Sequence, residues 1–206
     1  MRITWLGHSC FKITSQNSSI LIDPFEPGSV PGYSDISQTV DGVLCTHQHF
    51  DHNYTAGAII RENPDLSAFH ITEISAWHDD QNGALRGSNT IFLIEAEGIR
   101  LAHMGDIGCP LTQEQATLLK GLKACLIPIG GTYTVDAQGA QQILDVLCPE
   151  VIIPMHYRDG EYGFPELGTL EDFTTLFLNR SFQYYRSNEM ELTKDTPPHI
   201  AILNHP

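Results

Sequence analysis

The chain has 206 residues, 41% of them hydrophobic, and carries 25 acidic against 11 basic side chains, for a formal net charge of -14. This length suits one compact domain over residues 1–206, and the acidic excess repels phosphate backbones and anionic lipid. Nucleic acid and membranes are therefore not expected as partners, and no segment has the apolar length of a membrane span. The five cysteines lack a CxxC pair and predict reduced, mostly buried thiols in a cytoplasmic protein.

The first half of the chain predicts mainly β-structure. Residues 25–39 are rich in Gly, Pro and Ser and predict a loop. Residues 53–62 predict a helix that ends before Pro64. Alternating or continuous apolar patterns indicate strands over residues 2–6, 10–14, 19–23, 40–46, 66–78, 89–98 and 99–106.

The second half alternates helix and strand. Antiparallel strands followed by βαβ units predict mixed sheets covered by helices, which is a layered α/β or α+β domain. Helices are predicted over 112–120, with Thr112 as the N-cap, over 136–147 and over 170–178, and strands over 124–131, 149–157, 182–185 and 200–203.

The segment "HQHFDH", from His47 to His52, directly follows an apolar strand. His47 and His49 are two residues apart, so in a turn both imidazoles can point to one centre. Asp51 and His52 come next and, as neighbours, face another direction, which suits two adjacent cations better than one. Imidazole and carboxylate are ligands of zinc, manganese, iron and similar divalent ions. The motif therefore predicts the start of two metal sites.

One loop cannot complete two coordination spheres, so further ligands are expected at other strand ends. His78 ends its strand, Asp106 lies in the turn "HMGDIG", and His156 ends the segment "IPMH". Gly105 and Gly108 let the backbone turn sharply, which allows the aspartate to face inward. The complete set of candidate metal ligands is His47, His49, Asp51, His52, His78, Asp106 and His156.

HxHxDH, followed by a His, a Gly-Asp and a final His in that order, resembles the metallo-β-lactamase superfamily. The flanking segments "WLGHSCFKI", "ILIDPF", "AWH" and "IPIGG" resemble the small bacterial metal-dependent hydrolases related to the L-ascorbate-6-phosphate lactonases. The "WLGH" and HxHxDH segments are also similar to N-acyl-phosphatidylethanolamine phospholipase D. The likeness covers residues 1 to about 160. It implies a four-layer αββα sandwich with metals between the inner ends of its sheets.

The resemblance also implies how the ligands divide between two metals. The first metal would take His47, His49 and His78, the second Asp51, His52 and His156, and Asp106 would bridge both. Two metals about 3.5–4 Å apart share a water, lower its pKa and hold the resulting hydroxide for attack. Asp51 is then the residue expected to orient this water or take its proton.

Five further residues have weaker claims to the site. His8 in "WLGHS" is a candidate catalytic proton donor or substrate contact, with a structural role as the alternative. Tyr133, after a glycine turn, and Arg158, in "HYRDG", are candidate substrate-binding residues. His103 and Asp23 are expected to support the metal ligands through hydrogen bonds.

These features predict a dinuclear metal-dependent hydrolase, a phosphodiesterase or lactonase, that acts on a small anionic molecule such as a sugar-phosphate lactone. The chain has no room for the large insertion of RNA-processing superfamily members, and the motif is not the HxExD form of diiron oxygen-reducing members. A nuclease-type phosphodiesterase is one alternative, and a non-catalytic metal-binding or sensing scaffold is another. Seven ligands with one shared leave positions open for water, which favours catalysis.

The identity of the metal is not encoded by this ligand set. Nitrogen and oxygen ligands without thiolate suit two divalent ions, zinc before manganese, iron or nickel. Relatives in the superfamily commonly associate, so a homo-oligomer is expected as well.

Overall fold

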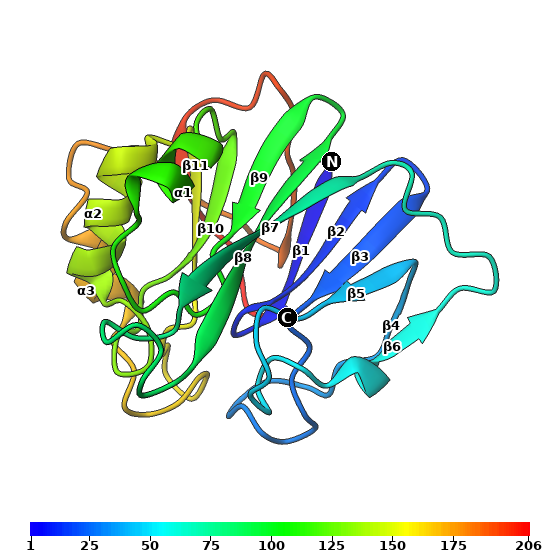
Figure 1. The fold of residues 1–206 in the computed structure, drawn as a ribbon, viewed down its shortest axis with the longest axis horizontal. Coiled ribbons are helices and arrows are strands. Elements are labelled where there is room, and N and C mark those ends of the chain that lie inside the picture. The colour runs from blue at the N-terminus through cyan, green and yellow to red at the C-terminus, as the bar shows by residue number, and fades with distance from the viewer.

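The computed structural model describes all 206 residues and contains two main β-sheets (Figure 1). The first has five strands in the order β13 (Glu189–Glu191), β1 (Arg2–Gly7), β2 (Cys10–Ser15), β3 (Ser18–Ile22) and β5 (Gly42–Leu44). The second has seven, in the order β12 (Phe182–Tyr184), β14 (His199–Ile202), β11 (Val151–Met155), β10 (Ala124–Pro128), β9 (Ile99–His103), β8 (Ser88–Ala96) and β7 (His70–Trp77). One hydrophobic core contains buried side chains of both sheets.

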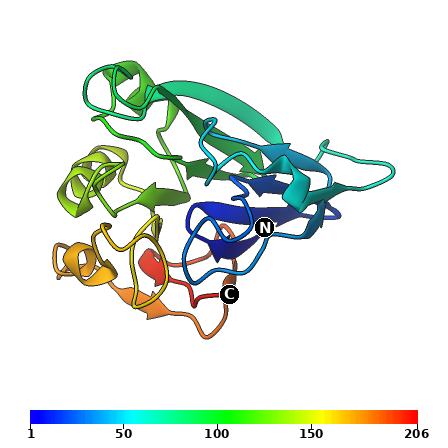
Figure 2. The same cartoon turned by 90° about the horizontal axis from the view of Figure 1, so that it is seen from below.

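The seven-stranded sheet changes character across its width. β7, β8 and β9 pair antiparallel, whereas β9, β10, β11, β14 and β12 pair in parallel. Parallel neighbours need crossover connections, and these contain α1 (Gln113–Leu118), α2 (Ala137–Leu147) and α3 (Leu170–Thr174). Figures 1 and 2 show the three helices on the outer side of this sheet. The predicted α/β sandwich is therefore confirmed, and its α-helices all come from the second half of the chain.

Local sequence explains where the helices begin and which face they bury. Thr112 caps α1 as predicted, in a reciprocal capping box with Gln115. Asp136 caps α2 by accepting a hydrogen bond from the backbone N–H of Gly139. One face of α2 packs inward because its buried residues recur every three or four positions: Ala137, Ala140, Ile143, Leu144 and Leu147.

The helix predicted over residues 53–62 is wrong. η1 (Thr55–Gly57) is a single 3-10 turn, and β6 (Ala58–Ile60) pairs in parallel with β4 (Gln38–Val40). No side chain caps the turn, and two β-branched isoleucines suit an extended strand. Pairing with β4, which begins inside the predicted loop, outweighs the weak local preference for helix.

Two expectations from composition can be compared with the fold. All five cysteines are free thiols, but only Cys10 and Cys125 are buried and Cys148 is exposed, so the expectation that most are buried is wrong. Among the helices, none combines the length and apolar character that crossing a membrane requires.

Candidate metal centre

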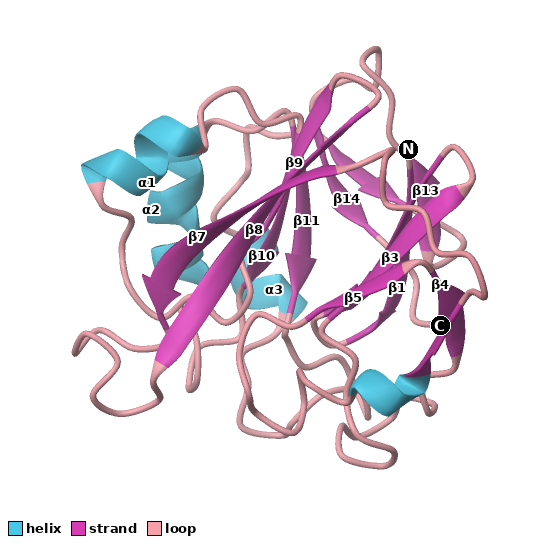
Figure 3. Cartoon of the chain, turned by 45° about the vertical axis from the view of Figure 1, so that its right-hand side comes forward, coloured by secondary structure: helices cyan, strands magenta, loops and turns pink.

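The candidate metal ligands lie in loops that follow strands of both sheets. The segment 47–52 follows β5, and His78, Asp106 and His156 follow β7, β9 and β11. Figure 3 shows the arrowheads of β7 and β11 pointing to the same edge of the molecule, where loops gather. The structure brings all seven predicted residues, with His8, into three overlapping groups whose ligand atoms lie within 4.8 Å of one another.

Asp106 lies at the centre of these groups. Its Oδ2 is 3.1 Å from Nε2 of His156 and 3.2 Å from Nε2 of His52. The same oxygen is 3.5 Å from Nε2 of His78 and 3.9 Å from Nε2 of His47. One carboxylate oxygen thus faces four imidazole nitrogens that come from three different loops.

Several atoms that face this centre are buried and have no hydrogen-bond partner. They include Nε2 of His47, Nε2 of His52, both ring nitrogens of His156 and Oδ1 of Asp106. Buried polar atoms in folded proteins are nearly always satisfied, so a gathering of unsatisfied lone pairs needs an explanation. Nitrogen and oxygen donors without thiolate are the ligands of divalent cations, and a bound cation would satisfy them together.

Asp23 orients two of the histidines from behind. Its Oδ2 accepts hydrogen bonds from Nδ1 of His52 at 2.9 Å and from Oγ1 of Thr46 at 2.7 Å. Because the Thr46 hydroxyl donates to Asp23, it accepts from Nδ1 of His47 at 2.9 Å. Both rings therefore carry a proton on Nδ1 and turn Nε2 towards Asp106, the orientation that metal-binding histidines need.

His78 is oriented in the same way by the main chain. Its Nδ1 donates to the carbonyl oxygen of Tyr133 at 3.1 Å, which leaves Nε2 free towards the centre. His49 is exposed, yet its ligand atom groups with those of His47 and His78. This three-histidine group is the one that the resemblance assigns to a single metal.

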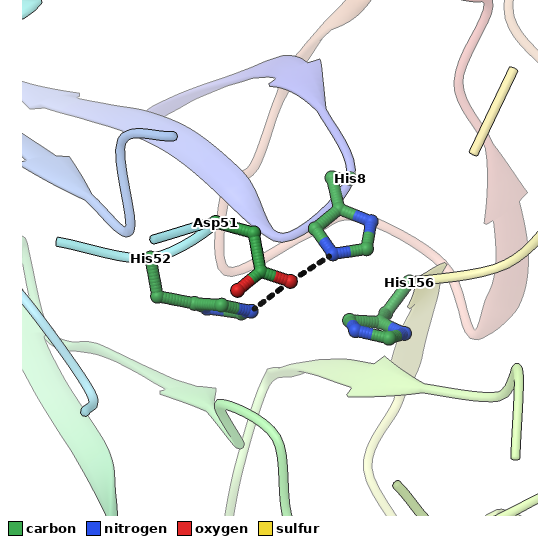
Figure 4. Close-up of side chains that lie close together, drawn as sticks. All are labelled: His8, Asp51, His52 and His156. Atoms are coloured by element: carbon green, nitrogen blue, oxygen red, sulfur yellow. Dashed lines mark hydrogen bonds and ion pairs between the residues drawn. The ribbon is translucent and has the colours of Figure 1, made fainter. Parts of the chain in front are cut away.

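The second group contains His8, Asp51, His52 and His156 (Figure 4). Nε2 of His8 lies 3.3 Å from Oδ2 of Asp51, and Nε2 of His52 lies 3.7 Å from the same oxygen. The rings of His8 and His156 are 4.0 Å apart between centroids. His8 is 1% exposed, so a ligand at the surface of the site would meet Asp51 and its neighbours rather than the His8 ring.

Burial and mutual charge set the protonation of the cluster in the absence of a cation. Burial lowers the pKa of His47 to about 3, and burial together with His156 lowers the pKa of His8 to about 4. Burial alone would raise the pKa of Asp106, but the charges of His156 and His52 outweigh it and hold that pKa well below its usual range. Asp106 is thus ionised and His47 neutral at ordinary pH, the protonation states of metal ligands. Burial would lower the pKa of His52, but the carboxylates of Asp106 and Asp23 outweigh it and raise that pKa, so a cation would have to displace a proton from His52.

The backbone around the cluster turns sharply. His8, Asp23 and His156 have φ angles of 51°, 51° and 53°, in the left-handed region that non-glycine residues rarely adopt. Gly108 allows a close approach, because a Cβ at that position would lie 2.4 Å from the carbonyl carbon and oxygen of His78. His8, Asp23 and His156 directly follow β1, β3 and β11, so these turns set the direction in which each side chain leaves its strand.

A cavity of about 330 Å³ opens beside the cluster. Its lining contains His49, Asp51, His78 and Asp106 together with Phe50, Arg86, Tyr133, Phe164 and Glu166. Of the last five, the sequence singled out only Tyr133, whose hydroxyl donates to Glu166. Phe50 occupies a variable position inside HxHxDH, whereas Arg86, Phe164 and Glu166 lie in loops without a recognisable motif. Only side-chain type and the turn chemistry near Asp79 could have drawn attention to these three.

Two predicted residues, Arg158 and His103, neither line this cavity nor bond to the side chain of a candidate metal ligand. Arg158 lines a separate cavity with Gly160, Thr169 and Tyr184, so the structure does not bring it together with the metal ligands. His103 is fully buried, donates from Nε2 to the Ser9 carbonyl at 2.9 Å and accepts at Nδ1 from the Gly105 N–H at 3.1 Å. It supports the turn that carries Asp106 and forms no hydrogen bond with the side chain of a candidate metal ligand.

Comparison with known proteins gives results that agree with this geometry. The family model of the β-lactamase superfamily domain matches residues 2–156. A metal-dependent hydrolase of the UPF0173 group from Archaeoglobus fulgidus is 30% identical over 195 residues, which is 77% of this chain and 84% of the relative.

Solved structures show the same similarity. A protein from Thermotoga maritima, described as a Zn-dependent hydrolase of the metallo-β-lactamase superfamily, superposes with a TM-score of 0.74 at 28% identity and covers 98% of this chain and 97% of its own. A metallo hydrolase from Ignicoccus hospitalis shares the fold, with a TM-score of 0.59 at 23% identity over 85% of this chain and 89% of its own. The family match, the fold and the motif order agree, and the chain belongs to the metallo-β-lactamase superfamily.

Proposed function

We propose that the protein is a metal-dependent hydrolase that binds two divalent ions and cleaves a small anionic phosphodiester or lactone. The observation that carries this proposal is the position of Asp106. One of its carboxylate oxygens, Oδ2, lies within 3.9 Å of Nε2 of four buried histidines. A carboxylate shared between two sets of imidazoles is what a pair of bridged cations requires. The relatives named metal-dependent hydrolases support the same reaction class.

The ligands divide naturally between two ions. One ion would take the three-histidine group, the other the group around Asp51, and Asp106 would bridge them: His47, His49 and His78; Asp51, His52 and His156. Zinc is the preferred ion because it favours imidazole and carboxylate at low coordination number, and the Thermotoga relative is described as Zn-dependent. When bound, the ions supply Lewis-acid polarisation of the scissile group and an acidified water.

The chain's own residues would position the reactants and hold a proton. Asp51 lines the cavity, so its carboxylate can orient the attacking water and accept its proton. His8, which lies 3.3 Å from that carboxylate and does not line the cavity, would hold Asp51 in place and share the proton. Tyr133 lines the cavity and would contact the substrate.

The cavity also bears on the two alternatives. A purely structural metal site is closed by protein ligands, whereas here Asp51 and Asp106 are reached from a cavity large enough for a small metabolite. A long nucleic acid would have to approach a chain with a net charge of -14. Both observations favour catalysis on a small molecule over a scaffold or a nuclease.

Metal content and hydrolysis measured on the same samples test the proposal. Zinc-loaded wild type is expected to hold about two metals per chain, by plasma mass spectrometry, and to hydrolyse bis(4-nitrophenyl) phosphate or dihydrocoumarin. Asp106→Asn should lose metal and activity together, while Asp41→Asn, remote from the cluster, should lose neither.

Three outcomes separate the alternatives. One metal per chain that is unaffected by Asp106→Asn would refute the bridge. Two metals with no turnover of either ester would favour the scaffold. Hydrolysis that survives full removal of metal would refute the reaction class altogether.

A further inference from the structure

Arg86 is an arginine of the cavity lining that no carboxylate neutralises. Its Nη2 donates to the carbonyl oxygen of Thr132 at 2.9 Å, and its guanidinium carbon lies 5.7 Å from the centre of the Tyr133 ring. By contrast, Arg61 is paired with a carboxylate at 2.6 Å. The guanidinium has five N–H donors, so most of those of Arg86 are free to meet a ligand in the cavity.

A dedicated loop fixes the position of Arg86. Asp79, directly after the candidate ligand His78, is 3% exposed. Its Oδ1 accepts from the backbone N–H groups of Gln81 and Gly83 at 2.8 and 2.9 Å, and its Oδ2 accepts from those of Leu85 and Arg86 at 3.0 and 2.7 Å. Four hydrogen bonds to one carboxylate tie the loop to the end of β7, so Arg86 is held at a fixed distance from the cluster.

The rest of the wall is aromatic. The ring of Phe164 packs edge-to-face on Phe50 and on Tyr133, at centroid distances of 6.5 and 6.3 Å. Phe50 is 51% exposed and lines the cavity, so part of its ring is open to a ligand. Glu166 accepts from the Tyr133 hydroxyl, so its carboxylate is already engaged, and Arg86 is the only Lys or Arg in the lining.

We propose that Arg86 is a specificity residue that binds a second anionic group of the substrate, a carboxylate or a phosphate, at a distance from the scissile bond. An apolar or planar unit between the two groups would lie against Phe50 and Phe164. The assignment rests on the hydrolytic site proposed above and adds the substrate class to it. Arg86 also takes the place of Arg158, the residue that the sequence suggested for this role, because Arg86 lines the cavity beside the candidate metal ligands and Arg158 lines another.

Two probes that differ in one charge test the assignment. Benzylphosphonate offers a single anion to the metal centre, and 4-carboxybenzylphosphonate adds a carboxylate across the ring. Affinities for zinc-loaded protein are measured by isothermal titration calorimetry for wild type, Arg86→Gln, Arg158→Gln and Arg186→Gln. Arg186 is an exposed arginine outside the cavity and controls for the loss of one positive charge.

Wild type is expected to bind the carboxylate probe about tenfold more tightly than the plain probe, the size of one charge-assisted hydrogen bond. Arg86→Gln should lose this preference and bind benzylphosphonate as wild type does, which shows that fold and cluster are intact. Arg158→Gln and Arg186→Gln should keep the preference. Arg86→Lys should keep part of it, since the charge remains but the planar fork is lost.

The assignment is overturned if wild type shows no preference, if Arg86→Gln keeps it, or if Arg158→Gln loses it. Failure of the proposed function has a different signature. If the wild-type protein hydrolyses neither phosphodiester nor lactone but shows the Arg86-dependent preference, the anion site stands and the proposed hydrolytic function is refuted.

Discussion

Replacing Asp23 with Asn should weaken metal binding without removing any candidate metal ligand. Oδ2 of Asp23 accepts from Oγ1 of Thr46 at 2.7 Å and from Nδ1 of His52 at 2.9 Å. An amide NH2 in place of that oxygen would face two donors. His52 could then remain bonded only by moving its proton from Nδ1 to Nε2, which lies 3.2 Å from Oδ2 of Asp106. A protonated Nε2 cannot bind a metal.

Flipping the amide does not rescue the network. Oδ1 of Asp23 accepts from the backbone N–H of Thr46 at 2.7 Å, so the flipped NH2 would face that donor instead. Either orientation leaves an unpaired donor in a fully buried site. Loss of such a supporting carboxylate typically weakens metal affinity about 10–100-fold, which corresponds to about 1.4–2.7 kcal/mol.

The assay is a competition titration of Zn²⁺ against a chromogenic chelator, with Asp41→Asn as the matched control. Asp41 is also a buried aspartate that accepts a backbone hydrogen bond, from Ser19 at 2.7 Å, but it does not contact the cluster. The control should bind zinc as wild type does. Equal zinc affinity in the two variants would refute the claim that Asp23 sets the tautomer of His52.

Three further predictions concern the supports of the site and of the fold. Asp79→Ala should release the loop that carries Arg86 and lower the affinity for a doubly anionic inhibitor about tenfold, with zinc affinity unchanged; a loss no larger than for a singly anionic inhibitor would contradict this. Burial alone would raise the pKa of Asp41, but backbone N–H donors and a neighbouring guanidinium outweigh it and lower that pKa. The carboxylate therefore contributes stability fully above pH 3.8, its ordinary pKa, and loses it as pH falls through the lowered value, so urea unfolding of Asp41→Asn should show a flatter decline below pH 4 than wild type. Gly108→Ala would place a Cβ 2.4 Å from the His78 carbonyl, and should lower both the thermal midpoint and the zinc content; an unchanged metal stoichiometry would argue that the loop adapts without moving His78.

The candidate metal ligands could be selected from sequence because metal-binding chemistry restricts residue type and spacing. HxHxDH in a loop directly after a buried strand leaves few alternatives to a cation site, and the residues after β7, β9 and β11 are placed by sheet topology alone. The structure does bring the seven residues together, while the roles assigned to them stay predictions until metal is measured. Asp23 was suggested by its place at a strand end, but the hydrogen-bond chain through Thr46 depends on the fold.

The remaining features depend on tertiary contacts that no local pattern encodes. Residues 53–62 have a helical pattern, yet pairing between β4 and β6 decides their conformation. Arg158 follows His156 closely in the chain, but His156 is buried among the candidate ligands whereas Arg158 lines a separate cavity. Arg86 reaches the site only because Asp79 folds its loop back, an effect of four backbone bonds rather than of a motif.

The left-handed backbone at His8, Asp23 and His156 has a consequence for how the protein could lose its function. At each position glycine would relieve a conformation that costs a side-chain-bearing residue about 1 kcal/mol or more. A metal that binds only the folded protein would offset this backbone strain. A substitution such as His8→Gly would relax the turn while it removes the imidazole. For this chain, the substitutions that would relax the backbone at these three positions are also the ones that would remove an imidazole or a carboxylate from the candidate site.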